Sequence, residues 1–350
     1  MKKVALVVGA TGIVGRQLIL ELASSNWKVY GICRRIPAKA NGWIPVSINL
    51  LDPNQCQVEI QKIDPITHVF YAARHTHVDQ GEPVIENIQM LSHLLDAVLY
   101  KNNSLRHVHL VHGMKVYGST LGPYKTPAKE TDPPTMADTF YFGQQALIED
   151  RQLGQKWTWS ISRPQTICGD DISQVRNLPR IIAIYAALCK ARGMRELDFP
   201  GTEKAFSSIY QVTHAPLLAR AIHWISTDEK CGNQVFNITN GDCFRWVNIW
   251  PAFCDYFGMR PGQPRSYKLV DLMAAKSQEW ESLINQQQLL KIPFADASQW
   301  RYADYIFGFQ YDVLSDQNKL RTYGFNETKD SEVMFLSIFK SIHDQGLTPW

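Results

Sequence analysis

The stretch KVALVVGATGIVG, residues 3–15, decides the fold of this 350-residue chain. Its apolar first half is typical of a central parallel strand that is buried on both faces, and the strand ends abruptly at Gly9. The turn that follows has three glycines at the spacing G-x-x-G-x-x-G, and the apolar residues after it, from about Val14 to Leu22, recur at helical spacing. A strand, a glycine-rich turn and a helix in this order predict a dinucleotide-binding unit, the alternative being a purely structural turn.

Each glycine of the turn has an expected role. Gly9 allows a tight turn, Gly12 removes a side chain where a pyrophosphate approaches the backbone, and Gly15 lets the helix pack close on the strand. The N-terminus of the helix adds free amide groups and the positive end of the helix dipole. The dinucleotide is therefore expected to contact Gly9, Thr11, Gly12, Ile13, Val14 and Gly15.

The second predicted strand, residues 28–33, indicates which dinucleotide is bound. Arg34 and Arg35 follow it, and no carboxylate stands where an NAD-binding unit carries one for the ribose 2′-hydroxyl. A guanidinium fork matches the 2′-phosphate of NADP, so we predict NADP(H), the alternative being two solvated arginines. A later strand, residues 68–73, ends in small residues, which let a cofactor pass close to the backbone at Tyr71 and Ala72.

The composition argues against nucleic-acid binding, membrane insertion and metal binding. The net charge is +3 without a basic run, so no nucleic-acid partner is expected. No apolar stretch reaches the roughly 18 residues of a membrane-spanning helix, and the first apolar run ends in the glycine loop rather than at a cleavage site, so we expect a cytoplasmic protein without membrane contact. The seven scattered cysteines show no metal-ligand spacing, so reduced thiols and no metal site are predicted.

The glycine spacing resembles that of short-chain dehydrogenases/reductases, in particular their extended branch. An ordinary extended member has S-S-x-x-V-Y-G after its fifth strand and Y-x-x-x-K on the next helix, whereas here Gly113 replaces the hydroxyl residue and the helix reads Tyr141-x-x-x-Gln145. A tyrosine with an ordinary pKa of about 10 is a poor acid unless a cation lies close. We therefore interpret Lys115, two residues after Gly113, as the replacement for the missing lysine. A surface lysine and a packing tyrosine are the alternative.

With these departures the chain resembles the progesterone 5β-reductase/iridoid synthase-like family, an atypical branch of the extended reductases. The matching stretches are GATGIVG (9–15), RR (34–35), THVFY (67–71), GMKVY (113–117), FY (140–141), WTWSISRP (157–164), YAALCK (185–190) and NGDCFRW (240–246). The family usually has two adjacent tyrosines where this chain has Tyr141-Phe142, and the spacing to Glu149 assigns the catalytic ring to Tyr141.

The resemblance implies further cofactor contacts. Residues 46–52 are a segment that we expect to be a short strand leading into a turn. In extended reductases an Asp or Asn at this point reads the adenine edge, and Asn49, followed by Leu50, occupies this place. The backbone after the sixth strand holds the nicotinamide carboxamide, which implies contacts at Thr166 and Ile167. The alternative for this last pair is a plain exit from strand to loop.

The predicted fold class is α/β, a doubly wound parallel (Rossmann) sheet with a smaller, mostly helical C-terminal substrate lobe. Residues 1–170 are expected to form the NADP-binding core, and residues 171–350 mainly the substrate-binding lobe, with residues 205–240 returning to the core. Helices are expected over residues 83–100, 178–193, 246–257 and 270–285.

The resemblance implies NADPH-dependent reduction of the C=C bond of an enone or enal by 1,4-hydride addition, with the enolate stabilised by Tyr141 and Lys115. The implied partner is a small apolar substrate with a conjugated carbonyl group, and a homodimer is the self-association that we consider. The alternatives are a carbonyl (1,2-) reductase, a non-catalytic NADP-binding redox sensor, and an NAD-dependent sugar-nucleotide epimerase or dehydratase. Gly113 and the Arg34-Arg35 pair speak against the epimerase or dehydratase.

Overall fold

The computed structural model describes residues 3–76, 83–100, 103–135 and 139–350. The chain divides into two compact units, each with its own core. The first unit comprises Met1–Gln165, Ala215–Ile238 and Asp316–Asn326, and the second comprises Thr166–His214, Thr239–Ser315 and Glu327–Trp350.

The first unit is built on a seven-stranded sheet in which all neighbouring strands are parallel. The spatial order is β11-β6-β5-β4-β1-β2-β3. The strands are β1 (Val4–Val8), β2 (Lys28–Cys33), β3 (Ile44–Ser47), β4 (His68–Tyr71), β5 (His107–Val111), β6 (Thr158–Pro164) and β11 (Gln234–Ile238). The chain winds outward from β1 to β3 and then restarts at β4 on the other side of β1, so the predicted doubly wound sheet is confirmed.

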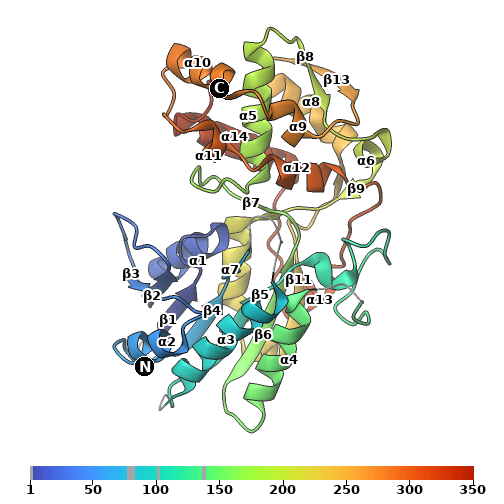
Figure 1. Ribbon diagram of the computed structural model, residues 1–350. Helices are drawn as coiled ribbons and strands as arrows, with labels where there is room; N and C mark the ends of the chain where they lie inside the picture. Colours follow the sequence, from blue (N-terminus) through green and yellow to red (C-terminus); the bar gives the residue numbers. More distant parts are fainter. Residues whose placement is uncertain (1–2, 77–82, 101–102, 136–138) are drawn as a thin grey trace. The chain divides into compact units, whose positions relative to one another are not determined.

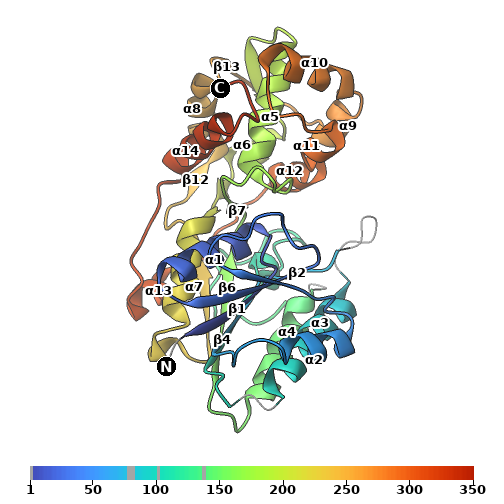
Figure 2. The ribbon, with the colours of Figure 1, turned by 90° about the vertical axis from the view of Figure 1, so that its left-hand side faces the viewer.

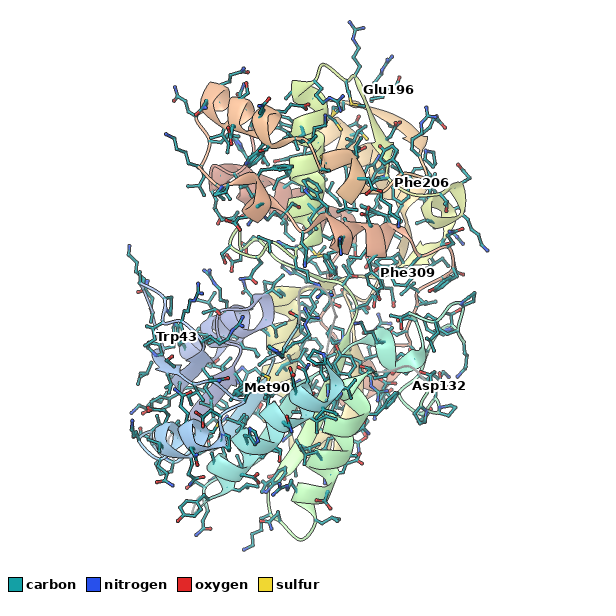
Figure 3. All side chains as sticks on the ribbon, viewed as in Figure 1. Trp43, Met90, Asp132, Glu196, Phe206 and Phe309 are labelled. Carbon is teal, nitrogen blue, oxygen red and sulfur yellow. The ribbon has the colours of Figure 1, made fainter. Side chains whose placement is uncertain are left out.

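Helices cover both faces of this sheet (Figures 1 and 2). The helices α1 (Ile13–Ser24) and α7 (Ala215–Ile225) pack against each other on one face. The other face carries α2 (Pro53–Ile60), α3 (Val84–Leu99) and α4 (Phe140–Gln152), with α3 in contact with both neighbours. Met90, labelled in Figure 3, is one of the α3 side chains buried in this layer. All residues of β1 are buried because both faces are covered.

The third strand is shorter than the sequence predicts. It ends at Ser47, so only Val46 and Ser47 of the segment 46–52 belong to the strand, and Asn49 lies in the turn that follows. Asn49 makes this turn itself, because its side-chain oxygen accepts from the Leu51 amide (3.2 Å) and its carbonyl from the Asp52 amide (2.9 Å). The Asp52 carboxylate then accepts from the Gln55 amide (3.0 Å) and caps α2.

The segment Asp316–Asn326 belongs to the first unit, whereas the sequence predicts that residues 171–350 form mainly the C-terminal lobe. Its helix α13 (Asn318–Tyr323) packs on β11, and the Asp316 amide donates to the Ala128 carbonyl (2.8 Å). The Tyr323 ring also stands edge-on to Phe236 of β11, with 5.2 Å between the ring centroids. These contacts join residues that are far apart in sequence, so no local pattern predicts them.

The second unit is mostly helical. Three short two-stranded ladders, β10-β7, β12-β9 and β13-β8, accompany its helices. The strands are β7 (Ile167–Cys168), β8 (Glu196–Phe199), β9 (Ile209–Tyr210), β10 (Thr213–His214), β12 (Phe244–Arg245) and β13 (Arg260–Pro264). The helices are α5 (Leu178–Ala191), α6 (Glu203–Ser207), α8 (Trp246–Tyr256), α9 (Leu269–Met273), α10 (Ser277–Gln287), α11 (Phe294–Ala297), α12 (Trp300–Phe307) and α14 (Ser331–Asp344).

Aromatic rings fill the core of the second unit. The Phe199 ring lies 4.8 Å from that of Phe206, which Figure 3 labels, and 5.3 and 5.0 Å from those of Trp250 and Phe307. Most of these contacts are tilted or edge-to-face, the arrangement that aromatic quadrupoles favour. The aromatic-rich C-terminal part of the sequence therefore serves, in large part, to build this core.

The single helix predicted over residues 270–285 is wrong, because the segment forms α9 and α10. The Asp304 carboxylate of α12 accepts from the amides of Leu269 and Val270 (2.6 and 3.0 Å) and fixes the start of α9. That helix packs on α12, whereas α10 packs on α5 and α11. Residues 274–276 between the two helices form a turn, in which the Lys276 amide donates to the Met273 carbonyl (3.1 Å).

Three features of the structure concern membrane-spanning helices, metal-binding groups and the state of the cysteines. In the part of the chain that the structure describes, no helix is long and apolar enough to cross a membrane. Among the same residues no group of three or more His, Cys, Asp or Glu side chains could hold a metal ion. The cysteines are free thiols, all buried except Cys243.

Buried histidines and hydroxyl side chains form a row between β5 and β6. The His107 ring contacts Thr158 Oγ1 (2.8 Å) and Ser160 Oγ (2.7 Å), and the His109 ring contacts Ser160 Oγ (2.7 Å) and Ser162 Oγ (3.0 Å). Burial lowers the pKa of His109 to about 3 and lowers the pKa of His107 well below its ordinary value. The folded protein therefore keeps these imidazoles neutral.

The free energy of unfolding should fall as the pH drops below about 6.5. Below this pH the histidines of the unfolded chain bind protons, whereas the buried histidines of the folded protein stay neutral. The loss should continue toward the folded pKa of His109, about 3. Each such histidine contributes a slope of up to about 1.4 kcal/mol per pH unit. Urea unfolding between about pH 8 and about pH 4 measures the slope. In the His109→Gln variant the slope should be smaller by about one proton, and an unchanged slope would contradict the assignment.

Candidate active site

Main-chain contacts hold the β1–α1 turn. Gly9 has a φ of 82°, and the amides of Gly9 and Ala10 both donate to the Ile32 carbonyl on β2 (3.2 and 3.1 Å). A Cβ atom built on Gly9 would lie 2.9 Å from the carbonyl oxygen of Ala72, and one built on Gly15 would lie 2.1 Å from that of Gly9. The turn therefore has no room for a side chain at the first and third glycines, as the spacing predicts.

The position beside Gly12 is less crowded than those beside Gly9 and Gly15. A Cβ atom built there would meet, among the described residues, only the carbonyl oxygen of Gly9, at 3.3 Å. Gly12 caps α1, so the amides of Ile13 and Val14 lie in the first turn, where no helix carbonyl accepts from them. Thr11 is exposed on the same turn. A pyrophosphate fits these donors, because amide groups and the positive helix end face a position without a side chain.

Arg34 and Arg35 follow β2 and are both exposed. Within the described ranges, neither guanidinium group forms an ion pair with a carboxylate. The Arg34 carbonyl accepts from Ser47 Oγ of β3 (3.3 Å), which connects the strand end to its neighbour. Both side chains thus remain available to an anion at this edge of the sheet.

The other predicted cofactor contacts of the first unit are Asn49, Leu50, Tyr71 and Ala72, and they differ in burial. Asn49 is exposed, and its side-chain oxygen is used by the turn. Leu50 is buried, and its carbonyl is in contact with His93 Nδ1 (2.9 Å). The Tyr71 side chain is 1% exposed within the core, where burial raises the pKa of its hydroxyl. For Tyr71 and Ala72 the main chain, rather than the side chain, lies at the end of β4.

Tyr141 lies in the first turn of α4, where the Thr139 hydroxyl accepts from its amide (3.5 Å). Its ring is stacked on His112 with 4.5 Å between centroids and an interplanar angle of 20°, and it stands edge-on to Phe140 at 4.6 Å. A Cβ atom built on Gly113 would lie 3.4 Å from the Tyr141 hydroxyl oxygen. The Tyr141 hydroxyl thus lies beside position 113, where the sequence lacks the expected Ser or Thr.

Lys115 is carried by a short 3₁₀ helix, η1 (Met114–Tyr117), that begins directly after Gly113. The helix ends at Gly118, whose φ of 77° favours glycine. Lys115 is half-buried, whereas the other three residues of η1 are buried. The two candidate catalytic residues are thus carried by elements that meet at Gly113.

The family model described as the PRISE-like Rossmann-fold domain matches residues 37–340 of this chain. The protein belongs to this family. The resemblance inferred from the glycine turn and from the GMKVY and FY stretches is therefore confirmed.

Two curated relatives of this PRISE-like protein align over nearly its whole length. An (S)-8-oxocitronellyl enol synthase of Nepeta racemosa is 32% identical over 367 residues, which cover 99% of this chain and 94% of the relative. A 3-oxo-Δ(4,5)-steroid 5β-reductase of Arabidopsis thaliana is 32% identical over 356 residues, which cover 96% and 90%.

Solved structures share the fold of the PRISE-like protein at low sequence identity. The Bordetella bronchiseptica enzyme WbmG, solved in complex with NAD, superimposes with a TM-score of 0.68 at 15% identity and covers 100% of this chain and 96% of its own. The UDP-glucose 4-epimerase of Bifidobacterium longum, solved with NAD⁺ and UDP, gives 0.66 at 15% identity, covering 99% and 100%. The Rossmann-fold family and the geometry of the glycine turn assign a nicotinamide dinucleotide to the carboxyl edge of the sheet.

Thr166 and Ile167 begin the second unit of the PRISE-like protein. Thr166 has an unusual φ of 25°; its hydroxyl contacts that of Tyr210 (2.7 Å) and its carbonyl accepts from the Thr213 amide (3.2 Å). Ile167 pairs with Thr213 in the β10-β7 ladder. The contacts of Thr166 and Ile167 with a nicotinamide carboxamide stay a prediction.

His112 and Arg163 lie beside the predicted site residues but are not among them. Burial, and secondarily the charge of Arg163, lowers the pKa of His112 well below its ordinary value, so a neutral imidazole lies against the Tyr141 ring. Arg163 is itself 6% exposed and donates to Tyr117 and Gln145. Both residues stand at or near the carboxyl end of a predicted strand, and Arg163 also lies in the family-like stretch WTWSISRP.

Two glycine variants separate the packing role of the turn from its binding role. Gly15→Ala should lower the free energy of unfolding by about 1–3 kcal/mol or more, because the new methyl group collides with the Gly9 carbonyl. Gly12→Ala should destabilise the protein less than Gly15→Ala does, because its methyl group meets the Gly9 carbonyl at 3.3 Å rather than 2.1 Å. It should weaken dinucleotide binding, because the methyl group enters the space where the pyrophosphate approaches the amides. Urea unfolding and fluorescence titration with NADPH measure the two effects. A stable Gly15→Ala protein, or unchanged binding by Gly12→Ala, would contradict this division.

Proposed function

We propose that this protein uses NADPH to reduce the C=C bond of a small apolar enone or enal, leaving the carbonyl group intact. The names of its relatives describe reactions of this kind, since one is an enol synthase and the other reduces a 3-oxo-Δ(4,5)-steroid at position 5. The observation that carries the proposal is the Tyr141 hydroxyl beside Gly113, with Lys115 on the adjoining η1 helix.

The absence of a hydroxyl side chain at position 113 bears on whether the enzyme reduces a C=O bond or a conjugated C=C bond. Reduction of a C=O bond produces an alkoxide, which needs full proton transfer to oxygen, and a hydroxyl at position 113 would assist the tyrosine in that step. Reduction of a conjugated C=C bond leaves negative charge on an enolate oxygen, which is a weaker base. A hydrogen bond from Tyr141 suffices to stabilise that charge. Gly113 therefore favours conjugate reduction over carbonyl reduction.

The chain's own residues have three tasks in this reaction. The glycine turn and the α1 N-terminus hold the pyrophosphate, and Arg34 and Arg35 hold the 2′-phosphate. The bound reduced nicotinamide supplies the hydride, which adds to the β-carbon of the substrate.

The third task is to stabilise the oxygen. As the electron pair of the C=C bond moves toward the carbonyl group, Tyr141 donates a hydrogen bond to the carbonyl oxygen and the ammonium group of Lys115 adds positive potential. Water then protonates the α-carbon of the enolate, which restores the carbonyl group and completes the balance.

NADPH should bind more tightly than NADH. Replacing Arg34 and Arg35 together by Ala should weaken NADPH binding by about 1–3 kcal/mol, because charge-assisted hydrogen bonds to the 2′-phosphate are lost. NADH binding should barely change, which serves as the internal control. Isothermal titration with both cofactors tests this expectation, and equal affinity of the unmodified protein for NADPH and NADH would refute it.

Product analysis tests the reaction itself. With NADPH and a panel of enones, enals and saturated ketones, the expected products are saturated carbonyl compounds. Allylic alcohols as the main product, or faster turnover of saturated ketones than of enones, would refute conjugate reduction and favour a carbonyl reductase.

The variants Tyr141→Phe and Lys115→Met provide the matched controls for that assay. Each should lower kcat while leaving NADPH binding intact, and Tyr141→Phe should keep measurable activity because Lys115 and water still stabilise an enolate. In the double variant the loss should be smaller than the product of the two single losses, because both residues act on one oxygen.

A further inference from the structure

Arg163 reaches two elements of the candidate site from β6. Its Nη1 donates to the Tyr117 hydroxyl (3.0 Å) and its Nη2 donates to Gln145 Oε1 (3.3 Å). Tyr117 is the last residue of η1, and Gln145 lies on α4. The two arms of one buried guanidinium group thus end on the helix that carries Lys115 and on the helix that carries Tyr141.

The Tyr117 arm is fixed at its far end. The Tyr117 hydroxyl donates to Asn237 Oδ1 of β11 (2.6 Å), and the Asn237 amide group in turn donates to the carbonyls of Ala128 (3.1 Å) and Asp316 (3.3 Å). The guanidinium carbon of Arg163 also lies 5.1 Å from the centroid of the Tyr117 ring. Since Tyr117 is 4% exposed and bound on both sides of its hydroxyl, η1 has little freedom to move.

The Gln145 arm is oriented as well. Gln145 is four residues after Tyr141, so both side chains lie on the same side of α4. Its Nε2 donates to Glu149 Oε1 (2.9 Å), which turns its Oε1 toward Arg163. A lysine at position 145, as in ordinary extended reductases, would face this guanidinium group with a like charge. A neutral acceptor at position 145 is therefore compatible with the buried guanidinium group of Arg163, whereas a lysine is not.

We propose that Arg163 is a positioning residue that fixes the Lys115 helix and the Tyr141 helix relative to each other, through Tyr117 and Gln145. This inference rests on the proposed function, because it concerns the geometry of the two groups that stabilise the enolate oxygen. Arg163 touches no reacting atom. Small displacements of such groups lower the rate of the chemical step, so the effect belongs in kcat.

The test uses one variant for each arm. Gln145→Met removes the acceptor on α4, and Tyr117→Phe removes the acceptor on η1. Each should lower kcat for enone reduction on the order of tenfold, while the KM for NADPH stays within about twofold. Gln145→Glu keeps an acceptor for Arg163 and should retain most of the activity. Glu149→Ala keeps the Gln145 acceptor and removes only the contact that orients it, so it should lower kcat less than Gln145→Met does.

A double-mutant cycle in urea unfolding tests the connection without using the reaction. Since both arms share Arg163, the destabilisation of the Tyr117→Phe/Gln145→Met protein should differ from the sum of the single effects. An additive cycle would overturn the proposal. So would unchanged kcat values in both single variants, provided that Lys115→Met lowers kcat.

Failure of the proposed function is visible separately. If the unmodified protein reduces no enone, or if Lys115→Met leaves its rate unchanged, the assignment of the enolate-stabilising groups is wrong. In either case the positioning role for Arg163 is wrong too, and a non-additive unfolding cycle then reports only a structural connection.

Discussion

The close approach of main chain to main chain at the β1–α1 turn is the constraint on which the first unit depends. Gly15 lies so near the Gly9 carbonyl, and Gly9 so near Ala72, that no side chain fits at either glycine. This contact places the first turn of α1 beside the ends of β1 and β4, so that its amide groups and its positive dipole end point to the carboxyl edge of the sheet. Binding of an anionic dinucleotide follows from this packing before any charged side chain contributes.

The proposed catalytic part of the same edge lacks two groups that ordinary extended reductases have. The hydroxyl at position 113 and the lysine at position 145 are both absent, and in their place stand Lys115 on η1 and a buried guanidinium group on β6. The positive charges of this site therefore lie on η1 and β6 rather than on α4. The described contacts of Arg163 are with neutral oxygens, which hold the group in place without cancelling its charge. The same charge helps to keep His112 neutral against the Tyr141 ring.

Much of the fold was predictable because it is encoded locally. The strand, glycine turn and helix at residues 3–24 follow from spacing alone, and the observed β2, α3 and α5 lie within a residue or two of their predicted bounds. The errors occur where local pattern and long-range packing disagree. The third strand ends at Ser47 because Asn49 makes a turn. The helix expected over residues 270–285 is interrupted by a turn at residues 274–276, and its two halves pack on different neighbours. Likewise Leu50 and Tyr71 stand at the predicted places, but their side chains are in the core.

The sequence by itself determined the dinucleotide turn, the arginine pair and the unusual spacing of Gly113, Lys115 and Tyr141, because each is a short-range pattern with a direct chemical meaning. Only the tertiary structure decided which groups hold these residues in place. Tyr117 and Asn237 are 120 positions apart, and Arg163 reaches Gln145 across 18. Such pairs form because burial removes water from polar groups and compels them to find partners, wherever in the chain those partners lie.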